Sequence, residues 1–271
     1  MIKYLIIIIL LFWGQTKIKA CSIFYFIDKA TGKIYVANNE DYWYNVKAYI
    51  QITPRSKNTF ARLWYGWDDF AQGGINEYGL FFDGAATPKQ LIPDGYFNPE
   101  GRDVGDEILS KCKSVDEAIN YLEQNKIALS EGHIIFGDKM GHAAVLEWIN
   151  KEKKVITLQD NILIATNFLL SDTSAGNFPC PRYKSIADRL IQLKQSVDVV
   201  DLKKVGNAIG GAVQLPKNDT KGKIGGTLYT SFINISDMEL ILVYKLDNKK
   251  ITKLDLNKVF ENKKRQKIRF K

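Results

Sequence analysis

The chain has 271 residues, of which 45% are hydrophobic and 25% are charged, and its formal net charge is +8. This composition is typical of a globular protein and excludes a low-complexity or disordered chain. Basic residues gather only in the segment 263–271, so we expect no nucleic-acid partner and a solvated or frayed end there.

The first twenty residues have the three parts of a secretory signal. Lys3 gives the positive start, residues 4–13 are an unbroken apolar run, and residues 14–20 form a polar exit ending in a small residue. This run is too short to span a bilayer as a helix. We therefore expect that residues 1–20 are removed and that the protein is exported to the periplasm or the extracellular space. A lipoprotein signal that acylates Cys21 is the alternative, which Lys19 disfavours.

Signal removal would make Cys21 the first residue of the mature chain. A terminal cysteine combines a thiol nucleophile with a free α-amine, which can serve as the base. An α-amine with an ordinary pKa of about 8 is partly neutral near pH 7 and can take the thiol proton. The position of a cysteine at the start of the mature chain therefore predicts a hydrolase. No Pro/Gly/Ser-rich linker divides residues 21–271, so we expect one catalytic domain with a basic C-terminal tail.

The predicted elements are strands near both ends with helices between them. In chain order we expect a hairpin of 22–26 and 34–37, strands at 48–52, 61–65 and 80–82, helices at 103–113 and 115–124, a second hairpin of 133–137 and 143–148, helices at 183–194 and 202–209, and a third hairpin of 227–233 and 240–245. Ser114 and Glu117 form a capping box for the second helix. This order fits an α+β fold of two packed sheets covered by helices.

Six short blocks follow one another along the chain: 21–22, 37–41, 72–80, 165–167, 181–183 and 227–231. Their order and spacing resemble the choloylglycine hydrolase and linear amide C–N hydrolase family, relatives of penicillin V acylases and bile salt hydrolases among the N-terminal nucleophile hydrolases. The resemblance covers nearly all of the mature chain. It implies a four-layer αββα sandwich of two mainly antiparallel sheets. It also implies hydrolysis of a small linear non-peptide amide through a thioester, without metal or cofactor.

The resemblance assigns four catalytic residues. It implies Cys21 as the nucleophile, Asp41 as the carboxylate that holds its α-amine, Asn167 as an oxyanion donor, and Arg182 as a charge near the site. These chemistries are reasonable, because a side-chain amide can stabilise a tetrahedral oxyanion and a guanidinium favours the reactive thiolate. The expected order is attack by Cys21, collapse with proton donation from the α-amine, and hydrolysis.

Two substrate-binding positions depart from bile salt hydrolases. Those enzymes have an arginine where this chain has Asn38 and an asparagine where it has Ala86. The second oxyanion donor must then be a backbone N–H or another side chain. The short stretch between Asn167 and Arg182 lacks the insert that bile salt hydrolases use in assembly, so the resemblance assigns no oligomeric state.

Other readings of the cysteines remain open. Cys21 could form a papain-like pair with His133 or His142, since such pairs are spatial rather than sequential. It could instead be the lipid anchor of a secreted binding domain, with the aromatic segment 63–70 as the pocket and membrane contact through the lipid. A bridge between Cys112 and Cys180 is possible in an oxidising compartment, but its geometry does not follow from the sequence.

Overall fold

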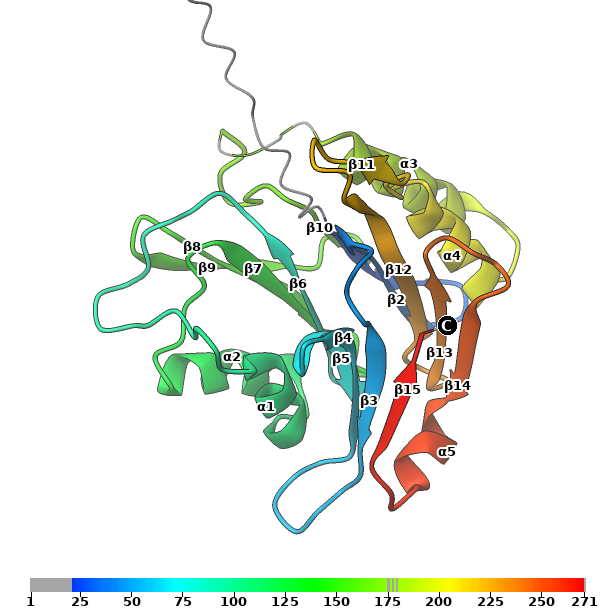
Figure 1. Ribbon diagram of the computed structural model, residues 1–271, viewed down its shortest axis with the longest axis horizontal. Coiled ribbons are helices and arrows are strands. Elements are labelled where there is room, and N and C mark those ends of the chain that lie inside the picture. Colours follow the sequence, from blue (N-terminus) through cyan, green and yellow to red (C-terminus); the bar gives the residue numbers. More distant parts are fainter. Residues whose placement is uncertain (1–20, 175, 177, 179, 271) are drawn as a thin grey trace, which may run out of the picture.

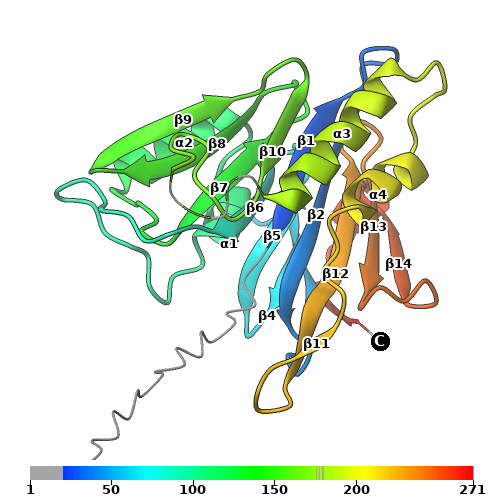
Figure 2. The same cartoon turned by 90° about the horizontal axis from the view of Figure 1, so that it is seen from above.

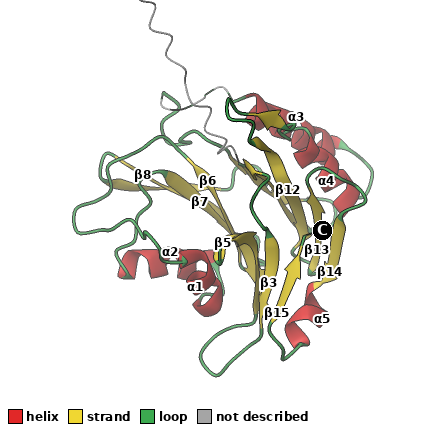
Figure 3. Ribbon diagram, viewed as in Figure 1, coloured by secondary structure: helices red, strands yellow, loops and turns green. Residues whose placement is uncertain are grey.

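The computed structural model describes residues 21–270 except 175, 177 and 179. The predicted signal, residues 1–20, and the last residue of the tail lie outside the described residues. Figure 1 shows two β-sheets packed against each other, and Figure 3 shows helices on their outer faces. On one side lie α1 (Val104–Lys111) and α2 (Val115–Gln124), and on the other α3 (Pro181–Gln195) and α4 (Leu202–Gly210). The α+β sandwich predicted from the sequence is confirmed.

The first sheet carries the N-terminal hairpin. Its strands are β1 (Ser22–Ile27), β2 (Ile34–Trp43), β10 (Ile162–Ala165), β11 (Lys217–Asn218), β12 (Ile224–Asn234), β13 (Glu239–Tyr244) and β14 (Ile251–Asp255). Their order is β10-β1-β2-β12-β13-β14, and β11 pairs with β12. Figure 2 shows α3 and α4 over this sheet. The short helix α5 (Leu256–Glu261) follows β14.

The second sheet carries the middle of the chain. Its strands are β3 (Tyr49–Thr53), β4 (Arg62–Trp67), β5 (Phe70–Asn76), β6 (Phe81–Ala86), β7 (Gly132–Gly137), β8 (Ala143–Ile149), β9 (Glu152–Thr157) and β15 (Gln266–Arg269). Their order is β15-β3-β4-β5-β6-β7-β8-β9, and all pairings between these strands are antiparallel.

Three apolar clusters hold the layers together. The central one lies between the sheets and includes Ile23, Tyr65 and Val145. A second joins the outer face of the β3–β9 sheet to α1 and α2, and a third joins the outer face of the other sheet to α3 and α4. Because side chains alternate along a strand, β1 sends Ile23 to the central cluster and Phe24 to the outer one. The same alternation determines which side chains of β2 face the candidate active site described below.

Strand β5 was missed by the sequence reading because its centre is Gln72-Gly73-Gly74, and glycine is depleted in strands. The fold requires glycine there. A Cβ on Gly73 would lie 2.3 Å from the carboxylate of Asp83, and one on Gly74 would lie 2.5 Å from the carbonyl oxygen of Leu63. The polar strand β9 was also missed, since its alternation is weak. The three predicted hairpins and four predicted helices are present. Their bounds agree with expectation within three residues, except that β2 continues to Trp43, well beyond its expected end at residue 37.

The expectation of a frayed C-terminal tail was wrong. Strand β15 pairs with β3, in register from Gln266 opposite Ile52 to Arg269 opposite Tyr49. The edge of β3 offers unpaired backbone groups, and a returning segment satisfies them. The apolar side chains of the tail pack against the central cluster between basic residues that remain exposed.

All three cysteines are free thiols, so the bridge that the sequence left open is not formed. Cys112 packs in the cluster beneath α1 and α2, whereas Cys180 precedes α3 on the opposite side of the molecule. Within the described part of the chain, no helix combines the length and hydropathy needed to cross a bilayer.

Candidate active site

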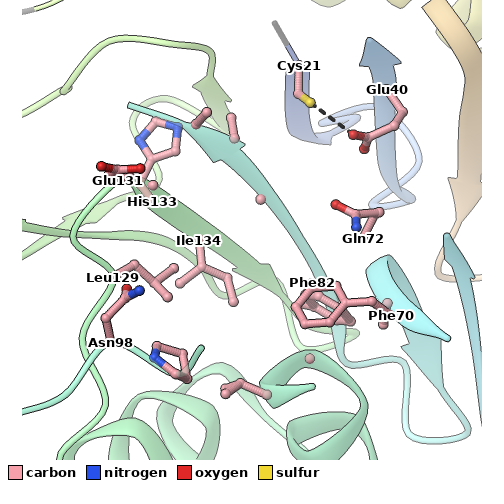
Figure 4. Close-up of a pocket in the computed structure, with 18 of the residues that line it drawn as sticks. Cys21, Glu40, Phe70, Gln72, Phe82, Asn98, Leu129, Glu131, His133 and Ile134 are labelled. Atoms are coloured by element: carbon pink, nitrogen blue, oxygen red, sulfur yellow. Dashed lines mark hydrogen bonds between the residues drawn. The ribbon is translucent and has the colours of Figure 1, made fainter. Parts of the chain in front are cut away.

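Cys21 stands at the start of the hairpin formed by β1 and β2. The register pairs Ser22 with Asn39, which brings Cys21 beside the next position, Glu40. The thiol Sγ donates a hydrogen bond to Glu40 Oε1 at 3.2 Å, drawn as a dashed line in Figure 4. Cys21 is only 7% exposed. Sequence reasoning missed Glu40, although strand alternation could have shown that it and Asp41 face opposite sides of β2.

A cavity of about 510 Å³ opens beside the thiol. β5 and β6 pair only from Gly73 to Ile75, and the residues of both strands beyond this point line the cavity. Figure 4 shows Cys21 and Glu40 on one wall with His133 and Glu131 across the space. Most of the lining between them is apolar and comes from the β3–β9 sheet, from α1 and α2, and from the segment between α2 and β7: Trp67, Phe70, Phe82, Val104, Leu122, Leu129 and Ile134.

Asp41 faces the other side of β2. Its Oδ1 accepts a hydrogen bond from Thr227 Oγ1 at 2.6 Å, and its Oδ2 accepts one from Arg182 Nη1 at 3.1 Å. Burial raises the pKa of Asp41 to about 7, while the Thr227 hydrogen bond and the Arg182 charge act in the opposite direction. An α-ammonium at Cys21 would add a further positive charge and favour the carboxylate.

Arg182 connects Asp41 to Asn167. Its Nη2 donates to Asn167 Oδ1 at 2.8 Å, and its Nη1 lies 3.5 Å from the backbone carbonyl oxygen of Cys21. Asn167 Nδ2 in turn donates to the carbonyl oxygen of Ala86 at 2.8 Å. An amide carries two N–H groups, so Asn167 keeps one for another acceptor. The fold thus brings the four catalytic residues suggested by the sequence into one connected group.

The two substrate-binding positions differ in location. Ala86 lies at the end of β6 and lines the cavity. Asn38 is fully buried in β2, where its Oδ1 accepts a hydrogen bond from Ser231 Oγ at 2.5 Å, and it does not line the cavity. The structure therefore gives no support to direct substrate contact by Asn38.

A second buried carboxyl lies near Glu40. Asp83 on β6 accepts a hydrogen bond from Tyr65 at 3.2 Å. Burial, followed by the charge of Glu40, raises the pKa of Asp83 well above its ordinary value. Burial and then the charge of Glu40 also raise the pKa of the Cys21 thiol, whereas the backbone N–H of Asp41 lowers it. These surroundings favour the neutral thiol over the thiolate.

The histidines have other partners. His133 Nδ1 lies 2.9 Å from Glu147 Oε1, and Glu147 also accepts hydrogen bonds from the backbone of Leu170 and from Ser171. His142 is exposed and lies near Asp138. Because the Sγ of Cys21 is hydrogen-bonded to Glu40 and not to a histidine, a papain-like Cys–His pair receives no support. In residues 21–270, apart from the three undescribed positions, no histidine, cysteine or carboxylate cluster suits a metal ion.

Changing Asn167 to alanine should lower kcat by about 10²-fold, with a smaller change in KM, because oxyanion donors act mainly in the transition state. Steady-state kinetics on the best amide substrate would measure both. Asn167→Asp is the matched variant, since it keeps the acceptor for Arg182 and loses the N–H donors. Near-normal kcat in Asn167→Asp would show that Asn167 serves only to hold Arg182.

The sequence matches no protein-family model and no curated protein. The structure, however, resembles two solved hydrolases over nearly the whole length of each. Penicillin V acylase from Agrobacterium tumefaciens superposes with a TM-score of 0.70 at 16% identity, covering 91% of this chain and 90% of that one. A variant of conjugated bile acid hydrolase from Clostridium perfringens gives 0.70 at 16% identity, covering 92% and 97%. The chain therefore has the fold of these two proteins, in agreement with the choloylglycine hydrolase resemblance carried by its sequence blocks.

Proposed function

We propose that this protein is an exported amidase that uses Cys21 as an N-terminal nucleophile to hydrolyse linear, non-peptide C–N amide bonds. The observation that carries the proposal is the position of the Cys21 thiol on the wall of the cavity, with Asp41, Arg182 and Asn167 connected behind it. The likeness to penicillin V acylase and conjugated bile acid hydrolase supports the same class of reaction.

The mechanism begins after removal of residues 1–20, which frees the α-amine of Cys21. The amine takes the thiol proton as Sγ attacks the amide carbon. Asp41, itself held by Thr227 and Arg182, orients the amine. The remaining N–H of Asn167 and the backbone N–H groups near Sγ are the candidate donors to the oxyanion. Departure of the substrate's amine leaves a thioester on Cys21, which water then hydrolyses.

The cavity favours an apolar acyl group. Its lining is mainly aromatic and aliphatic, and about 510 Å³ is within the size range of small-molecule sites. We therefore propose an aryl or alkyl amide as the substrate. The mature protein should be screened against N-acyl amino acids, acyl lactones, penicillin V and conjugated bile salts. Absence of turnover across this panel, with protein that begins at Cys21, would contradict the proposal.

Conjugated bile salts should be poor substrates, with kcat/KM well below that of the best fatty or aryl amide. The reason is that Ala86, on the cavity wall, stands where the resemblance places an asparagine of bile salt hydrolases, so that polar group is absent here. Their arginine is also absent, because Asn38 stands in its place and lies buried outside the cavity. Parallel kinetics with taurocholate and the best amide of the screen would measure the ratio. Comparable values of kcat/KM would refute this expectation.

A further inference from the structure

The carboxyl group of Glu40 touches the proposed nucleophile, yet the mechanism above gives it no role. The contact is set by the backbone, because Cys21 and Glu40 lie side by side in the β1–β2 hairpin. Glu40 also lines the cavity. In a tetrahedral intermediate the leaving nitrogen is only two bonds from Sγ, so a group hydrogen-bonded to Sγ on the cavity wall is within reach of that nitrogen.

The surroundings of Glu40 favour its neutral form. Its side chain is buried, and Oε2 has no hydrogen-bond partner among the described residues. Burial is the main cause that raises the pKa of Glu40 to about 8, while the Cys21 hydrogen bond acts in the opposite direction. The side chains that titrate around it come from Cys21 and from β2, β4, β6 and β12, and they are negative when ionised: Cys21, Asp41, Tyr65, Asp83 and Tyr229. The α-amine that processing frees on Cys21 is positive when protonated and acts in the opposite direction.

We infer that Glu40 is a further catalytic residue of the proposed reaction and acts as the neutral acid that protonates the leaving amine. A carboxylic acid has an O–H to donate, which a carboxylate lacks. As the oxyanion collapses, the C–N bond breaks, the nitrogen takes the proton from Glu40, and a carboxylate remains. The α-amine keeps the thiol proton as an ammonium. The base that activates the thiol and the acid that protonates the leaving nitrogen are therefore different groups.

Hydrolysis of the thioester restores both groups. Water attacks the thioester carbon while the Glu40 carboxylate takes one proton from it. The C–S bond breaks, and the sulfur receives the proton held by the α-ammonium. Each cycle therefore ends with a neutral Glu40, a neutral amine and a thiol. The inference rests on the amidase function proposed above.

The decisive test compares leaving groups in Glu40→Gln. A glutamine keeps the size of the side chain but cannot transfer a proton. We expect acylation of an N-alkyl amide to slow by about 10²-fold or more. The acylation burst on a p-nitrophenyl ester of the same acid should change little, because that leaving group needs no proton. Equal losses on the two substrates would overturn the inference.

The pH dependence gives a second readout that needs no variant. The α-amine must be neutral and Glu40 protonated, and burial raises the pKa of Glu40 to about 8, so amide turnover by the wild-type protein should pass through a maximum and fall on the alkaline side of about pH 8. Ester acylation should not show this fall. A wild-type amide profile that stays flat or rises from pH 7 to 9.5 would overturn the inference, even if Glu40→Gln failed to fold.

Alkylation of Cys21 by iodoacetamide, followed on its own peptide, separates this inference from the function itself. An ionised Glu40 suppresses the thiolate, so the alkylation midpoint in Glu40→Gln should lie lower by about one pH unit or more. Glu131→Gln, the same change across the cavity, should leave the midpoint unchanged. An unchanged midpoint in Glu40→Gln overturns the inference. If the alkylation midpoint shifts but the protein hydrolyses no amide, the proposed amidase function fails, and the catalytic role of Glu40 fails with it. The contact between Glu40 and the Cys21 thiol is then still supported.

Discussion

Replacing Cys21 with alanine should abolish amide hydrolysis while leaving the fold intact. The thiol supplies the bond to the acyl group, and no other described group stands at that point of the cavity wall to replace it. The β1 strand keeps its backbone pairing with β2 and β10 in the variant, so the sheet is preserved. Turnover of the best amide, together with circular dichroism and a thermal unfolding curve, would measure both halves of this expectation.

Cys21→Ser is the matched control for this experiment. It keeps a hydrogen-bond donor beside Glu40 but replaces the thiol by a hydroxyl, which is a much weaker acid and a poorer nucleophile. We expect little activity to remain. Unchanged turnover by Cys21→Ala would remove the assignment of Cys21 as the nucleophile and would leave the cavity as a binding site only.

One extra residue before Cys21 that cannot be trimmed should also eliminate activity. The thiol would remain in contact with Glu40, but the α-amine would become a peptide nitrogen with no lone pair available for a proton. The loss should therefore be comparable to that of Cys21→Ala. A protein that starts with the added residue, verified by intact mass, should be compared with protein that starts at Cys21.

The control for the extended protein is thiol chemistry. Iodoacetamide should still alkylate Cys21, since the added residue removes the base and not the nucleophile. Full amidase activity in the extended protein would show that the α-amine is dispensable. A diacylglyceryl or N-acyl adduct on Cys21 in protein from the native host would instead support the lipid-anchor reading and contradict the N-terminal nucleophile mechanism.

The sequence determined the parts of this protein that depend on local order. An apolar run followed by a polar exit predicts a signal that ends before Cys21, and the turn at residues 28–33 predicted the first hairpin, which the structure contains. Side-chain caps set the helices: Asp103 and Ser114 each accept a hydrogen bond from a backbone N–H in the first turn of α1 and α2. Asp41 was chosen through the family resemblance of the block 37–41, and the structure places it inside β2.

Tertiary structure decided which distant groups meet. Arg182 reaches Asp41 across 141 positions of sequence, and the tail returns to β3 only because that edge has free backbone groups. The role inferred for Glu40 also depends on packing, since a glutamate carboxyl is ordinarily ionised, whereas that of Glu40 in β2 is buried against Cys21. Local patterns specify strands and caps because those involve neighbouring residues. The cavity and the electrostatics of its wall arise only when two sheets close over one another and remove these groups from water.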